Sequence, residues 1–249
     1  MDARELLKLH RYDEAVAACR ARLATNPDDW AAMGTLASAY RAIGAYSDAL
    51  QFFERIDTHE RKDPIAPGRP GRRMDISCLY WCLGDRAKSI RLMSELIQGV
   101  LNNSIKFADL AGGVHQGLLL YYMGVSAVDP EVASCALAYM QERSERPAAR
   151  MWPGPLGRYY LGQINFEDVL VGATGQRSVE SAIDAARTDL LKRRQLCGAL
   201  FHDGAKNRAQ GMEELCFIRM QECHALENPL IEPEWYLARC EVERARLLR

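Results

Sequence analysis

The residues of this sequence that are best suited to chemistry are its eight cysteines and five histidines. Cys78 and Cys82 stand four residues apart, which would put both thiols on one face of a helix, and Cys223 directly precedes His224. Such a pair is half of a structural zinc site, which needs four ligands. Because neither pair has a second pair at a suitable spacing, we expect no bound metal and no other cofactor. The cysteines are then small, semi-apolar residues that fill helix interfaces.

Catalytic signatures are absent from the sequence. It has no phosphate-binding loop that ends in Gly-Lys-Ser/Thr, no His-Glu-x-x-His and no Gly-x-Ser-x-Gly. His202 precedes Asp203, but adjacent residues on a helix do not face each other, so this pair is not a preformed dyad. We expect a histidine on the surface or in a groove instead. The sequence predicts a protein that is not an enzyme and has no catalytic residues.

Composition narrows the classes of partner and compartment. Hydrophobic residues make up 48% of the 249 residues and charged residues 26%, with a formal net charge of −1, as in ordinary globular proteins. This charge balance supplies no long-range field for nucleic acid. The longest apolar stretch, 114–128, falls short of the roughly 20 residues that cross a bilayer. With scattered cysteines and no signal sequence, we expect a cytoplasmic protein without membrane insertion.

An internal repeat organises the first quarter of the chain. Tyr12 and Tyr46 stand 34 residues apart, and so do Ala15 and Ala49. A period of this length indicates helix pairs that stack on one another, because no single pair can bury its apolar face alone.

The pattern of large and small residues around the second repeat resembles the tetratricopeptide repeat family. Residues 30–63 form the best unit and residues 1–29 a truncated first unit. The resemblance implies an all-α helical-repeat solenoid. The residues that carry it are Leu36, Ala37, Tyr40, Gly44, Tyr46, Ala49 and Phe53.

Beyond residue 63 the repeats are degenerate. Prolines and glycines in 64–73 predict a linker, and 74–249 is expected to be a degenerate helical region with irregular middle helices. Asp129 and Asn165 are predicted helix caps, and 234–248 is predicted to be a charged capping helix. The C-terminal part is also similar to bacterial tetratricopeptide lipoproteins, although it has no lipidation signal. Signature positions of a third unit are occupied by Ile76, Tyr80, Gly84, Ser89, Met93 and Leu96.

The resemblance also implies where a partner binds, because the first helix of each pair lines a concave groove in this family. Arginine and tryptophan are enriched at interface hot spots, so Arg41, Trp81 and Arg208 rank first. For each candidate the alternative is an ordinary helix residue, and aromatic residues near mid-chain, such as Tyr121 and Tyr160, are expected in the core. The groove candidates are Thr35, Ser38, Arg41, Asp75, Trp81, Phe201, His202 and Arg208.

Two functions fit these observations. The first is a bacterial cytosolic adaptor or scaffold that holds a protein or peptide partner on the concave surface. The second is an immunity protein that binds and neutralises a cognate bacterial toxin, which the eroded repeats and the resemblance of 83–120 to uncharacterised bacterial repeat proteins suggest. Both are protein-binding functions without catalysis.

Overall fold

The structure is a computed structural model that describes residues 1–62, 70–105, 113–230 and 232–247. Throughout these residues the regular secondary structure is helical, without a strand, which confirms the predicted all-α class. The chain divides into two compact units, Met1–Ser89 and Ile90–Arg249. None of the described helices combines the length and the apolar character needed to cross a bilayer.

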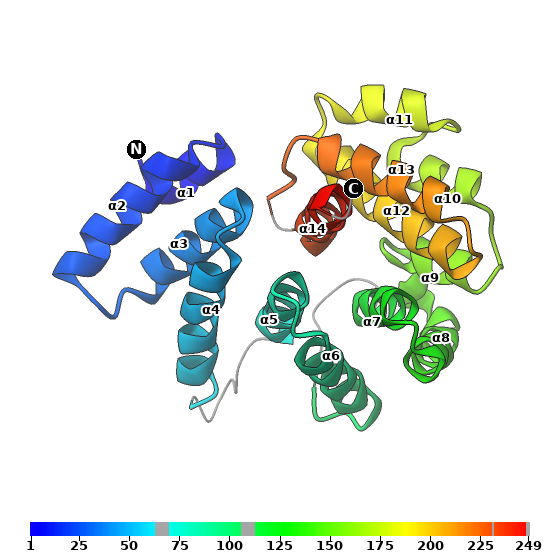
Figure 1. The fold of residues 1–249 in the computed structure, drawn as a ribbon, viewed down its shortest axis with the longest axis horizontal. Helices are drawn as coiled ribbons and strands as arrows, with labels where there is room; N and C mark the ends of the chain where they lie inside the picture. The colour runs from blue at the N-terminus through cyan, green and yellow to red at the C-terminus, as the bar shows by residue number, and fades with distance from the viewer. Residues whose placement is uncertain (63–69, 106–112, 231, 248–249) are drawn as a thin grey trace. The chain divides into compact units, whose positions relative to one another are not determined.

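Unit 1 is built from successive helix pairs (Figure 1). The first helix has only six residues, as expected for a truncated repeat. Its helices are α1 (Ala3–Lys8), α2 (Tyr12–Thr25), α3 (Trp30–Ile43), α4 (Tyr46–Glu60), α5 (Pro70–Cys82) and the first turn of α6 (Arg86–Leu101), which continues into unit 2.

Local sequence explains where these helices begin and end. The Asp29 carboxylate accepts a hydrogen bond from the Ala32 amide across 2.9 Å and so caps α3. Gly44 follows α3 with a φ of 85°, a left-handed conformation that costs glycine little. The predicted linker is shorter than expected, because α5 already begins at Pro70, and proline is well tolerated in the first helical turn. Residues 64–69 of that linker, and residue 63 before it, lie outside the described residues.

Small residues allow the paired helices to approach. Ala37 and Ala49 are completely buried between α3 and α4. In the next pair, Ser77 and Ser89 are also fully buried, and the Ser77 hydroxyl donates to the Ser89 carbonyl oxygen across 2.8 Å. The hydroxyl is therefore satisfied inside the packed interface, where an unpaired polar group would be costly.

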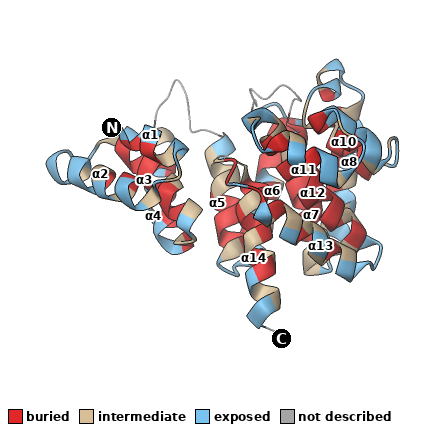
Figure 2. Ribbon diagram, turned by 90° about the horizontal axis from the view of Figure 1, so that it is seen from above, coloured by how far each residue is buried: buried red, intermediate tan, exposed pale blue. Residues whose placement is uncertain are grey.

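Unit 2 places helix α12 at its centre, and every residue from Leu196 to Ala205 is buried (Figure 2). The mostly apolar sequence at 107–123 predicts a helix, which is described only from Val114 onward, since 106–112 lie outside the described residues. Besides the rest of α6 and a short 3-10 helix, unit 2 contains α7 (Val114–Ala127), α8 (Pro130–Ser144), α9 (Gly154–Tyr160), α10 (Phe166–Thr174), α11 (Val179–Ala186), α12 (Leu190–Ala209), α13 (Glu213–Ala225) and α14 (Pro233–Leu247).

Two predicted caps are confirmed. The Asp129 side chain accepts from the amides of Glu131 and Val132 at the start of α8. Asn165 and Asp168 form a reciprocal capping box at the start of α10. Polar side chains thus satisfy backbone donors that the first turn of a helix leaves open.

The last helix, α14, covers the segment that the sequence predicts to be an amphipathic, charged capping helix. Helix α14 packs against α12 and α13, and Tyr236, Leu237 and Ala238 are buried. Its first acidic residue, Glu234, is also buried, with only 2% of its surface exposed. The N-terminal half of α14 thus contributes to the core of unit 2.

Candidate functional site

The groove candidates of unit 1 lie on α3 and α5. Arg41 is only 5% exposed, and its guanidinium bonds the Asp75 carboxylate across 2.7 Å. Thr35 is buried, with its hydroxyl on the Ala31 carbonyl oxygen. Ser38 is half-buried. Arg41 and Asp75 therefore connect the first helices of two successive pairs, and Ser38 remains within reach of a partner.

The large aromatic candidates lie in the interior. Trp81, Phe201 and His202 are each fully buried. Burial of a large apolar side chain such as Phe201 stabilises a fold by roughly 1.5–3 kcal/mol. This gain favours a place in the core over an exposed place in a groove. The expectation that His202 lies on the surface or in a groove is wrong, because α12 is the central helix of unit 2.

Arg208 is the groove candidate near the C-terminal end of α12. Its guanidinium bonds Glu241 of α14 across 3.1 Å and the Ser126 hydroxyl of α7 across 2.8 Å. The side chain is 19% exposed. Arg208 therefore joins three helices of unit 2.

Asp203 does not orient His202, as the helix geometry predicted. Its carboxylate accepts from the Tyr159 hydroxyl and from the Arg219 guanidinium, each across 2.6 Å. Burial and the Asp203 carboxylate raise the pKa of Tyr159 far above its usual range, so Tyr159 stays protonated and donates. Tyr159 and its neighbour Tyr160 are buried, as expected for these aromatics.

His202 instead belongs to a cluster with His115 and Glu234. His115 Nε2 and His202 Nε2 lie 2.6 Å and 3.1 Å from the same atom, Glu234 Oε1. The three residues come from α7, α12 and α14, and their ligand atoms all lie within 4.8 Å of one another. Two imidazoles and one carboxylate thus meet at one point inside unit 2.

The surroundings of this cluster fix its charges. Burial lowers the pKa of His202, so this imidazole is neutral, and its Nδ1 lies 2.8 Å from the Tyr160 hydroxyl. Burial alone would raise the pKa of Glu234, but the bonds from His115 and His202 outweigh it and keep that pKa well below its usual range. Glu234 is therefore a buried carboxylate.

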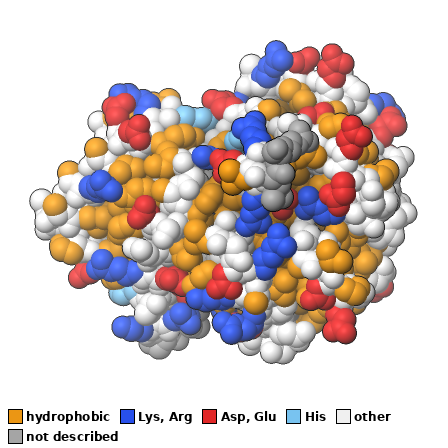
Figure 3. Space-filling model, viewed as in Figure 1, with side chains coloured by type: hydrophobic (Ala, Val, Ile, Leu, Met, Phe, Trp, Pro, Cys, Tyr) orange, Lys and Arg blue, Asp and Glu red, His pale blue; other side chains and the backbone are white. Residues whose placement is uncertain are grey.

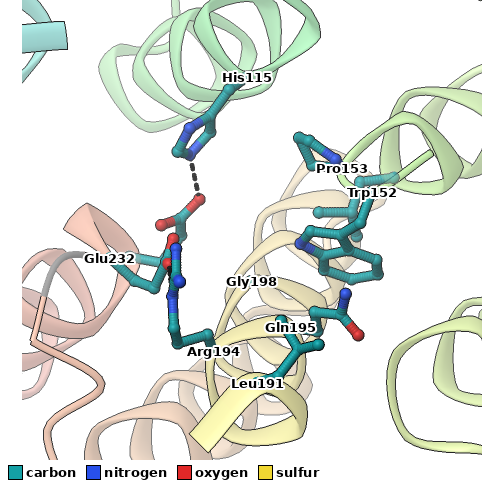
Figure 4. Close-up of a pocket in the computed structure, with 10 residues that line it drawn as sticks. His115, Trp152, Pro153, Leu191, Arg194, Gln195, Gly198 and Glu232 are labelled. Atoms are coloured by element: carbon teal, nitrogen blue, oxygen red, sulfur yellow. Dashed lines mark hydrogen bonds and ion pairs between the residues drawn. The ribbon is translucent and has the colours of Figure 1, made fainter. Parts of the chain in front are cut away.

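A pocket of about 250 Å³ opens beside the cluster. Figure 4 shows His115 pointing from its helix to the carboxylate, with Trp152 across the pocket. Arg194 bonds Glu232 on the wall across 2.5 Å. Burial and the nearby Glu234 raise the pKa of Glu232. The lining residues are His115, Trp152, Pro153, Leu156, Leu191, Arg194, Gln195, Gly198, Glu232 and Glu234.

Sequence reasoning missed His115 and Glu234. They are 119 residues apart, and neither has a second ligand-type partner at a spacing that a local motif would reveal. Glu234 also stands at the start of a segment that the sequence predicts only as an amphipathic capping helix. Only the packing of α7, α12 and α14 brings the three side chains together.

The paired helices of unit 1 define a helical-repeat protein. Residues 6–66 match the family model of the tetratricopeptide repeat, and repeats of this family generally mediate protein–protein interaction. No curated protein matches the chain.

Proposed function

We propose that this chain is a non-enzymatic adaptor of the bacterial cytosol that binds a protein or peptide partner through the first helices of its repeat pairs. The observation that carries the proposal is the match of residues 6–66 to a repeat family whose members typically act as non-catalytic scaffolds.

The partner-facing surface centres on α3. Ala31, Gly34 and Ser38 are spaced three, four and seven residues apart, which puts them on one face of that helix. Ala31 is exposed, and Gly34 and Ser38 are half-buried. A Cβ added at Gly34 would meet no atom within 4 Å, so a side chain there enters open space. Small residues next to open space leave room for a partner chain to approach the helix backbone.

Unit 1 also exposes apolar area on α2, the second helix of the first pair. Figure 3 shows hydrophobic side chains gathered over the part of unit 1 that contains α2 and α3. Val16 and Ala18 of α2 are only partly buried where they pack on the cluster of Leu6, Ala15 and Ala39. Contact with such a surface contributes about 25 cal/mol per Å² of apolar area removed from water.

The test compares two glycine substitutions at positions with open space. Gly34→Arg puts a bulky side chain on the proposed face, and Gly172→Arg does so on α10 of unit 2, where a Cβ also meets no atom within 4 Å. Each tagged protein is used to capture partners from lysate of its native host, followed by mass spectrometry. We expect a stoichiometric partner with wild type and Gly172→Arg, and at least a tenfold loss with Gly34→Arg. Equal capture by all three would overturn the proposed face.

The same experiment separates the adaptor from the immunity protein that the sequence also suggested. A toxin as the single stoichiometric partner supports the immunity function and contradicts the adaptor. Partners of a cellular assembly support the adaptor. Either result leaves the face on α3 to be decided by Gly34→Arg.

A further inference from the structure

The cluster in unit 2 contains a polar atom that its hydrogen bonds do not use. Glu234 Oε1 lies within hydrogen-bonding distance of both His115 Nε2 and His202 Nε2, while Glu234 Oε2 is buried without a hydrogen-bond partner. A buried acceptor without a partner costs free energy, and more when it is charged. A glutamate that is only 2% exposed therefore destabilises the fold more than an apolar residue would if its side chain did nothing except fill the core.

We propose that His115, His202 and Glu234 form a binding site for one divalent transition-metal ion. A cation between the three side chains gives Oε2 or Oε1 a partner and compensates the buried negative charge. Ligand atoms within 4.8 Å of one another need only small side-chain shifts to surround an ion at 2.0–2.2 Å, the range for nitrogen and carboxylate ligands of zinc.

The donor set selects the class of metal. Two imidazole nitrogens and one carboxylate oxygen suit Zn²⁺, Fe²⁺ or Co²⁺, whereas Ca²⁺ and Mg²⁺ prefer oxygen ligands throughout. Three protein ligands also leave at least one coordination position for water or another small ligand. Because His115 and Glu234 line the pocket of about 250 Å³, this open position has space beside it.

Tyr160 contacts His202 on the side of the imidazole that faces away from Glu234. Its hydroxyl lies 2.8 Å from His202 Nδ1, the nitrogen that faces away from Glu234. When Nδ1 carries the proton and donates to Tyr160, the lone pair of Nε2 is directed at the ion. A hydrogen bond on the distal nitrogen is the usual way in which proteins orient a metal-binding histidine. His202 is fully buried, so its orientation is also fixed by packing.

The site is tested with the full, tag-free chain, stripped of metal with a chelator and titrated with Co²⁺ and with Zn²⁺. Bound Co²⁺ gives visible d–d absorption, and calorimetry gives the stoichiometry and Kd. We expect one ion per chain. His115→Ala, which changes the most accessible of the three side chains at 17% exposure, and Glu234→Gln, which keeps the shape, should each weaken binding at least tenfold. Tyr160→Phe should weaken it about tenfold.

His224→Ala is the matched control, because His224 is another half-buried histidine of unit 2 that packs on Trp235 outside the cluster. It should bind Co²⁺ like wild type. Circular dichroism of every variant confirms that the helices are intact. Absence of Co²⁺ and Zn²⁺ binding by the folded wild type would overturn the proposal, and so would unchanged binding by both folded His115→Ala and folded Glu234→Gln. The outcome is independent of partner capture.

Discussion

Arg41 of α3 donates from Nη1 to Asp75 Oδ1 of α5 across 2.7 Å, and this pair links the first helices of successive repeats. Both residues were candidates for partner contact. Their side chains are 6% and 23% exposed, so much of the hydrogen-bonding capacity of Arg41 is directed into unit 1. The Arg41 guanidinium also lies 5.7 Å from the centre of the Phe53 ring, within the range of cation–π contact.

Breaking this pair should destabilise the protein. Arg41→Met removes the ion pair with Asp75, and we expect a loss of about 1–3 kcal/mol in the free energy of unfolding, less than for a fully buried pair because Asp75 is partly exposed. Urea denaturation of Arg41→Met, of Asp75→Asn and of the double variant gives the coupling energy between the two residues. Lys8→Ala, at the exposed Lys8–Glu5 pair, is the control and should cost no more than about 0.5 kcal/mol. A coupling near zero for Arg41 and Asp75 would contradict the prediction.

Replacing Asp57 of α4 should stabilise the protein at neutral pH, whereas replacing Arg41 should destabilise it. The size of the Asp57 effect should depend on pH. Asp57 is 4% exposed, Oδ1 has no hydrogen-bond partner, and Oδ2 forms an ion pair with Arg61 Nε across 2.9 Å. Burial raises the pKa of Asp57 in the folded state, so its contribution to stability is present below the unfolded pKa near 3.9 and declines as pH rises through the folded pKa. At pH 7 the ionised carboxylate is therefore a cost.

The neutral variant Asp57→Asn removes that cost. Relative to wild type, its free energy of unfolding should increase as the pH is raised from about 3 to 7, by about 1 kcal/mol, the scale for a buried polar atom without a partner. Urea midpoints of both proteins at several pH values measure the difference. A constant difference, or one that falls with rising pH, would show that the Arg61 contact outweighs burial.

Gly124 permits the close packing of α7 on α8. A Cβ at this position would lie 2.6 Å from the Ala133 backbone nitrogen, and a backbone atom cannot move aside as a flexible side chain does. We expect Gly124→Ala to destabilise unit 2 by about 1–3 kcal/mol. Gly172→Ala, in the interior of α10 with open space around it, should instead stabilise by up to about 1 kcal/mol through helix propensity. Thermal unfolding followed by circular dichroism compares them, and equal shifts would refute the packing argument.

Several elements were predictable because their signals are local. The 34-residue spacing of Tyr12 and Tyr46 indicated the repeat, and the all-helical class and the family match confirm it. Asp129 and Asn165 were recognised as caps since a capping side chain bonds amides only two or three residues further along the chain. Helix caps and helix propensity depend on residues a few positions apart, and the repeat period on one helix pair. A pattern in the sequence can therefore reveal them.

Burial of particular side chains required the tertiary structure. The sequence placed Trp81 and His202 on first helices of repeat pairs, but it could not say which face of a degenerate repeat becomes interior. It assigned Glu234 to an amphipathic capping helix, but it could not say that this carboxylate lies on the packed face. Whether a charged residue is buried depends on the partners that other helices supply. Here the partner of Glu234 is His115, which lies 119 residues earlier in the chain.

The amino-acid sequence by itself determined the helical class, the repeat period and the local caps, because each is encoded within one helix pair. Only the tertiary structure decided that His115, His202 and Glu234 meet beside a pocket and that Arg41 bonds Asp75. Contacts of this kind join helices that are distant in the chain, and their geometry follows from the packing of whole helices.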